Sequence, residues 1–169
     1  SMDLFFAFLQ KGGAAYGYLL QHPLFLLSCF LHLGIATITD LKYMKIPNKL
    51  NGVFLGINSI LFVLYPLFMG DGERAVTALI GGLCAFLLLL VPAVITGFQM
   101  AGDIKCVGVF GLALGGYGLV PFFALALLLN IATNLTLITI KKKEKQAVIP
   151  FAPFFLMAFA MCIGVTILN

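Results

Sequence analysis

Two aspartates, Asp40 and Asp103, are the residues whose positions in the 169-residue sequence suggest chemistry. Asp40 ends one long apolar segment and Asp103 begins another. Ionisable side chains at membrane depth are costly and usually mark function. If two such carboxyl groups meet, they can share one proton. One can then take a proton from water while the other polarises a carbonyl group. The two aspartates could therefore hydrolyse a peptide bond without a metal ion or another cofactor.

A simpler interpretation is that both acids mark the solvated ends of apolar segments, because Lys42 and Lys105 lie near them in the sequence. The residues around them favour a site. Gly102 directly precedes Asp103 and lets the chain turn without a Cβ clash, whereas Pro47 favours extended backbone soon after the other acid. Irregular backbone near membrane depth persists only where protein or water satisfies its polar groups. A wet pocket is therefore expected beside both acids.

The elements that must position these acids are membrane-spanning helices. The chain is 62% hydrophobic and 9% charged, with a mean hydropathy of +1.13, whereas soluble domains are about a quarter charged. About 20 apolar residues of helix cross a bilayer. The sequence therefore predicts an all-α, polytopic membrane protein, a bundle of about six transmembrane helices. The expected spans are residues 24–39, 52–69, 75–96, 104–114, 119–140 and 151–168. The fourth is too short to cross alone, so it begins inside the bundle or continues through residues 115–118.

The basic residues predict the orientation of these spans. If the six spans alternate, eight of the ten Lys and Arg residues fall on one side, and only Lys11 and Arg74 fall on the other. The eight are Lys42, Lys45, Lys49, Lys105, Lys141, Lys142, Lys143 and Lys145. Basic residues gather on the cytoplasmic side of membrane proteins. The two aspartates are therefore expected at the cytoplasmic face, and the lysines indicate topology and no nucleic-acid partner.

The length of the chain allows one membrane domain. Residues 24–169 are expected to form this six-helix domain. Residues 1–23 are expected to form an N-terminal interfacial or extra-cytoplasmic segment, because Lys11 and two glycines interrupt its apolar residues. A seventh span in this segment is the weaker alternative.

Three motifs around the aspartates resemble the type IV prepilin peptidase family, including its short forms for tight-adherence pili and archaeal flagella. The first is Asp40 followed by Lys45-Ile46-Pro47-Asn48. The second is Gly102-Asp103-Ile104-Lys105, similar to the GxGD signature and its downstream lysine, with Met100 in place of the first glycine. The third is Pro150-Phe151-Ala152-Pro153, similar to the Pro-Phe-x-Pro segment that opens the last helix of the family.

The resemblance implies an aspartic endopeptidase of the prokaryotic cytoplasmic membrane, without a metal or cofactor. Asp40 and Asp103 would be catalytic, and the remaining motif residues would support the site: Gly102, Lys105, Pro47, Asn48, Pro150 and Pro153. The partners implied are the substrate helix of a prepilin-like or preflagellin-like precursor and membrane lipid. Cleavage would fall just before that hydrophobic helix. Long members also carry a cysteine-bearing insert and methylate the new N-terminus. This chain shows neither feature, so we expect a peptidase only.

Two other classes of protein remain as alternatives. A proton- or ion-coupled transporter would also use intramembrane carboxylates, although transport sites usually lie near the midplane of the membrane. A structural subunit of a pilus or secretion machine would need no catalytic acids. His32 is expected to be a helix-contact histidine, with a proton relay as the alternative. Asn130 and Asn134 are expected to form helix-to-helix hydrogen bonds, with a role in lining the substrate path as the alternative.

Overall fold

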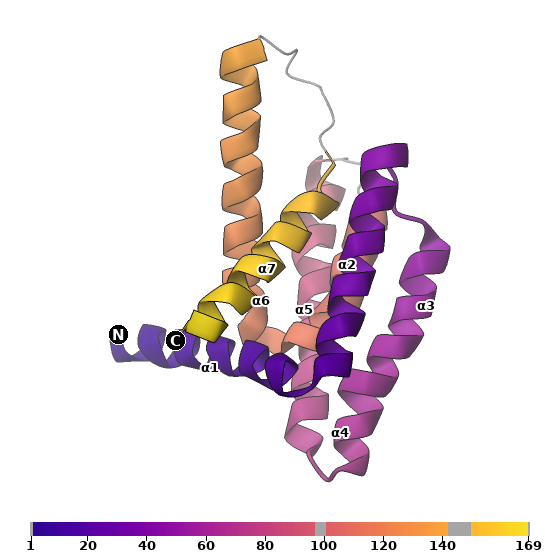
Figure 1. Cartoon of the computed structure of the whole chain (residues 1–169), viewed down its shortest axis with the longest axis vertical. Helices are drawn as coiled ribbons and strands as arrows, with labels where there is room; N and C mark the ends of the chain where they lie inside the picture. Colours follow the sequence, from indigo (N-terminus) through magenta and orange to yellow (C-terminus); the bar gives the residue numbers. More distant parts are fainter. Residues whose placement is uncertain (1, 97–100, 142–149, 169) are drawn as a thin grey trace.

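The computed structural model describes residues 2–96, 101–141 and 150–168, and within these ranges the chain contains helices and turns but no strand. The elements are α1 (Met2–Gln21), α2 (Pro23–Tyr43), α3 (Asn48–Ser59), the π-helical turn η1 (Ile60–Leu64), α4 (Tyr65–Phe68), α5 (Gly72–Thr96), α6 (Ala101–Lys141) and α7 (Ala152–Leu168). They form a helical bundle (Figure 1). The predicted all-α, polytopic membrane fold is confirmed.

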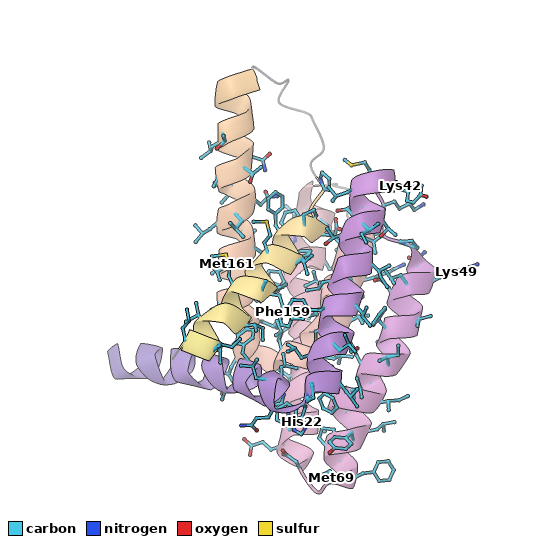
Figure 2. The ribbon with its side chains drawn as sticks, in the orientation of Figure 1. His22, Lys42, Lys49, Met69, Phe159 and Met161 are labelled. Atoms are coloured by element: carbon cyan, nitrogen blue, oxygen red, sulfur yellow. The ribbon has the colours of Figure 1, made fainter. Side chains whose placement is uncertain are left out.

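The bundle has two distinct ends. Lys42 and Lys49 lie at one end, which we call the lysine end, and His22 and Met69 lie at the other, the histidine end (Figure 2). Helix α2 runs from the histidine end to the lysine end, and α3, η1 and α4 run back to the histidine end. Helix α5 then runs to the lysine end again (Figure 1). The last turn of α2 and the first turn of α6 therefore both belong to the lysine end.

Four helical stretches in the described residues are long and apolar enough to cross a membrane: Pro23–Tyr43, Asn48–Phe68, Gly72–Ile95 and Ala101–Thr136. The second contains the π-helical turn, which comes just before Pro66. A proline ring clashes with the carbonyl four residues earlier in a regular helix. The wider π turn gives room for that ring, so the span continues without a break.

Helix α6 contains both the fourth and the fifth predicted spans. Its backbone leaves helical geometry at Gly115, where φ is 63° and ψ is 179°. Only glycine adopts such a conformation readily. The chain turns back here, so that both ends of α6 lie towards the lysine end (Figure 1). The helical stretch of the fourth predicted span therefore runs from Ala101 to Gly115 and does not continue through residues 115–118 as one sequence-based alternative expected.

Glycines bring α5 and the first half of α6 into close contact. A Cβ added to Gly81 would lie 2.5 Å from the carbonyl oxygen of Gly111 and 2.5 Å from the Cα of Gly115. A Cβ added to Gly111 would lie 2.6 Å from the Cβ of Ala85. Small residues let helix backbones approach closely in membranes. The α5–α6 pair is therefore a backbone-to-backbone contact that no larger side chain can enter.

We expect Gly81→Ala to destabilise the protein by about 1–3 kcal/mol, because the new methyl group meets backbone atoms that cannot move aside. Thermal unfolding in detergent measures the effect. Gly56→Ala is the matched control, since a Cβ on this helical glycine meets nothing within 4 Å. Equal unfolding temperatures for the two variants would contradict the packing described here.

Aromatic side chains hold α7 against both halves of α6. Phe155 and Phe159 are fully buried. Phe155 stacks on Phe122 with ring centroids 5.7 Å apart, and Phe159 meets Phe110 edge-on at 5.1 Å. Such ring pairs add to the packing energy of the buried area. They fix the angle at which the first turn of α7 reaches the lysine end.

Helix α1 lies across the histidine end of the bundle (Figure 1). Tyr16 in this helix donates a 2.6 Å hydrogen bond to the carbonyl oxygen of Gly118. Only His22 separates α1 from α2. It is the N-cap of α2, and Pro23 occupies the first helical position, where proline is well tolerated. A helix in this orientation suits an interfacial segment. The division at residue 23 stays a prediction.

The asparagines of the second half of α6 differ from the sequence-based expectation. Asn134 donates from Nδ2 to the carbonyl oxygen of Asn130 at 2.8 Å and to its Oδ1 at 3.0 Å. These bonds run along α6 and not to a neighbouring helix. Residues four apart share one helix face, and here the side chain of Asn134 forms its hydrogen bonds with Asn130 of the same helix.

Candidate active site

Asp40 and Asp103 come together at the lysine end. Asp40 lies in the last turn of α2 and is 5% exposed, and Asp103 lies half-buried in the first turn of α6. The two carboxyl groups thus lie on two helices at the same end of the bundle, near enough to interact electrostatically. Helices far apart in sequence thus bring two acids to one place, as the sequence predicted.

The carboxylate of Asp40 also binds the start of α7. Its Oδ2 accepts a 3.0 Å hydrogen bond from the backbone N–H of Ala152. Ala152 is the first residue of α7, and the first N–H groups of a helix have no partner within it. Pro153 follows in the first turn, where its missing N–H does no harm. The predicted supporting residues Pro150 and Pro153 thus flank the N–H that contacts Asp40.

The linker between α2 and α3 packs against the residue before Asp103. Met44 ends α2 in the left-handed conformation, with φ 51°, and Pro47 is the extended N-cap of α3. Between them Ile46 is 2% exposed. A Cβ on Gly102 would lie 3.1 Å from the carbonyl oxygen and 3.2 Å from the Cβ of Ile46. Glycine at position 102 therefore lets the linker approach α6, beside the position of Asp103.

Lys105 of α6 and Asn48 of α3 form a second contact near Asp103. The ammonium of Lys105 donates a 3.0 Å hydrogen bond to Oδ1 of Asn48, in an exposed position. Two predicted supporting residues from different motifs thus meet directly. Met100, the departure from the GxGD signature, lies outside the described residues.

Asn51 is a site-supporting residue that the sequence analysis missed. It is 4% exposed, and its Nδ2 donates to the carbonyl oxygen of Gly102 at 3.2 Å. Its Oδ1 lies 3.5 Å from Nε2 of His32, which in turn lies 3.7 Å from Sγ of Cys106. His32 is therefore a contact between helices, as the favoured interpretation held. Asn51 of α3 thus connects α2, through His32, with α6, through Gly102, the residue before Asp103.

Asn58 repeats this arrangement two turns deeper. It is fully buried, accepts a 3.1 Å hydrogen bond from the hydroxyl of Ser28, and donates at 3.2 Å to the carbonyl oxygen of Val109. Asn51 and Asn58 are seven residues apart, which is close to two helical turns and one face. That spacing of polar residues within an apolar segment was the sequence signal for both.

No three His, Cys, Asp or Glu side chains in the described part of the chain gather closely enough to hold a metal ion. The described polar groups around Asp40 and Asp103 include the two carboxyl groups, the exposed ammonium of Lys105 and several amides. This combination has the acid and base groups that hydrolysis of an amide requires.

The fold and these residues define a multi-pass helical membrane protein with a pair of acids at one end of the bundle. The model of the type IV leader peptidase family matches residues 24–168, so the chain belongs to that family and the resemblance seen in the sequence is confirmed. A curated relative, the prepilin leader peptidase/N-methyltransferase of Bacillus subtilis (strain 168), is 31% identical over 120 residues.

That match covers 70% of this chain and 46% of the relative. The chain therefore spans less than half of the length of this bifunctional relative. No solved structure matches the chain.

Proposed function

We propose that the chain is a membrane-embedded aspartic endopeptidase that removes the leader peptide of type IV pilin-like precursors, with Asp40 and Asp103 as its catalytic residues. The observation that carries this proposal is the position of the two acids, in the last turn of α2 and the first turn of α6, at the same end of a membrane bundle (Figure 1). Family membership supports the substrate class. The N-methyltransferase activity in the relative's name is not part of the proposal.

The proposed reaction needs one ionised and one neutral carboxyl group. The carboxylate takes a proton from water, and the resulting hydroxide oxygen bonds to the carbonyl carbon of the leader's last residue. The neutral acid hydrogen-bonds the carbonyl oxygen and offsets the charge that develops there. The C–N bond then breaks and the departing amine takes up a proton from the pair.

The remaining motif residues would act by holding the two acids in place. Ala152 fixes one oxygen of Asp40, and the contact of Gly102 with Ile46 sets the start of α6. Errors of about 1 Å in such positions cost on the order of a hundredfold in rate. Pro47, Asn48, Lys105, Pro150 and Pro153 are proposed as positioning residues for this reason.

The lysine end is proposed to face the cytoplasm. Lys42, Lys45, Lys49 and Lys105 belong to elements at this end, whereas Arg74 lies near the start of α5 at the other. This distribution follows the positive-inside rule. Residues 24–169 would then form the peptidase domain, and residues 1–23 an interfacial segment on the outer side.

Incubating the purified chain in detergent with a membrane-bound prepilin tests the function directly. We expect a product shortened by the leader, with a mass that places the cut just before the apolar helix. A metal chelator should leave the rate unchanged. Ion flux in liposomes without any cleavage would instead support a transporter, and the absence of both activities would support a structural subunit.

A further inference from the structure

A groove of about 510 Å³ lies between α3, α5 and α6, on a side of the bundle that no other described helix covers. Gly52 and Leu55 of α3 line one wall, and Leu79 and Leu83 of α5 line the other. Leu55, Leu79 and Leu83 are about half exposed. The groove is thus open sideways, towards the space that lipid or another helix would occupy.

The polarity of the groove changes along its length. At the lysine end it is lined by Asn48, Asn51 and Lys105, and further down by leucines and by Phe86. Lys105 is two residues beyond Asp103, and Asn51 donates to the peptide just before that acid. The polar part of the groove therefore lies beside the first turns of α6, the helix that carries Asp103.

Glycines let α5 and α6 pack closely at the floor of the groove and leave its α3 wall open. Gly82 and Gly108 lie where α5 meets α6, and a Cβ on Gly108 would lie 3.1 Å from the Cβ of Phe86. On the α3 wall, a Cβ at Gly52 would meet nothing within 4 Å. Backbone exposed beside small residues is typical of helix-to-helix contacts in membranes. The groove therefore suits a helix better than a lipid chain, which gains nothing from close backbone approach.

We propose that this groove receives the apolar helix that follows the scissile bond of the substrate. This inference rests on the proposed function, since it assigns a binding site to the helix of the same precursor. An apolar helix in the groove would place its N-terminal end among Asn48, Asn51 and Lys105. Lys105 is two residues beyond Asp103, so the scissile segment would cross the first turn of α6 to reach that acid. The substrate would approach sideways through the membrane.

Gly52→Leu tests whether the groove binds the substrate helix. A Cβ at this position lies in open space, so the larger side chain should fill part of the groove without disturbing the packing of the chain. We expect at least a tenfold higher KM for a full-length membrane-bound prepilin, with little change in kcat or in thermal unfolding. Gly34→Leu is the matched control. It is the same change at a glycine of α2 that has nothing within 4 Å and does not line the groove, and it should leave KM unchanged.

Photo-crosslinking gives a second readout that is independent of turnover. A photoreactive residue at Leu83 should capture the prepilin, and one at Ile38, which is 66% exposed on α2, should not. Wild-type KM for Gly52→Leu, together with crosslinks from position 83 to lipid alone, would overturn the groove assignment while cleavage by the wild type upholds the proposed function. Failure of the wild type to cleave any prepilin would reject the proposed function instead, and the crosslinks would still report on the groove.

Discussion

Replacing either Asp40 or Asp103 by Asn is expected to lower the rate of leader cleavage by at least about a hundredfold, the usual contribution of one acid or base in a hydrolytic site. Asparagine has nearly the same shape but can neither take a proton from water nor give one to the departing amine. Both variants should be inactive because the two acids share one proton and act as a unit. The measurement is cleavage of a prepilin by equal amounts of purified protein.

These substitutions should leave the fold intact. The amide oxygen of an asparagine at position 40 can still accept the hydrogen bond from Ala152, whereas Asp40→Ala would leave a buried N–H without a partner, at a cost of about 1–3 kcal/mol. Asp71→Asn, at an exposed position at the far end of the bundle, is the matched control and should cleave normally. Full cleavage by either catalytic-site variant would rule out the aspartic mechanism.

The second large effect is expected at Asn51. Asn51→Leu removes the hydrogen bond to Gly102, the residue before Asp103, and the contact with His32. Buried polar bonds between membrane helices contribute on average about 0.6 and at most about 1.7 kcal/mol each. We therefore expect a modest loss of thermal stability. Because the start of α6 is no longer fixed, cleavage should fall on the order of 10–100-fold.

Asn58→Leu provides the comparison that separates positioning from stability. It removes the equivalent pair of bonds, to Ser28 and Val109, but about two turns away from the acids. Its unfolding temperature should fall about as much as that of Asn51→Leu while its cleavage rate stays near that of the wild type. Equal losses of activity in the two variants would show that Asn51 acts through stability alone.

Much of this architecture follows from composition and periodicity. The apolar segments predict the helices, and the distribution of lysines predicts that both acids lie at the same end of the bundle. The first predicted span, residues 24–39, begins one residue after the start of α2 at Pro23. These features depend on local sequence and on the bilayer thickness, which is why a single chain is enough to predict them.

Other features depend on contacts that no local pattern encodes. The hydrogen bond between Asp40 and Ala152 joins residues 112 apart in sequence, and the contact of Gly102 with Ile46 depends on how the α2–α3 linker folds. Asn51 could have been singled out by its spacing from Asn58, but the same argument failed for Asn134, whose bonds stay within its own helix. The spacing of polar residues predicts that they share one helix face, but it does not predict which groups that face contacts.

The turn at Gly115 also bears on how the family can vary in length. At the histidine end the chain turns from α1 into α2 at a single non-helical residue, His22. It turns from α4 into α5 around Gly70 and reverses direction within α6 at the non-helical Gly115. Inserted residues there would have to break a helix or separate α5 from α6. We therefore expect insertions and deletions among relatives to gather in the connections at the lysine end, so that accessory modules would arise beside the acids and leave the histidine end nearly constant.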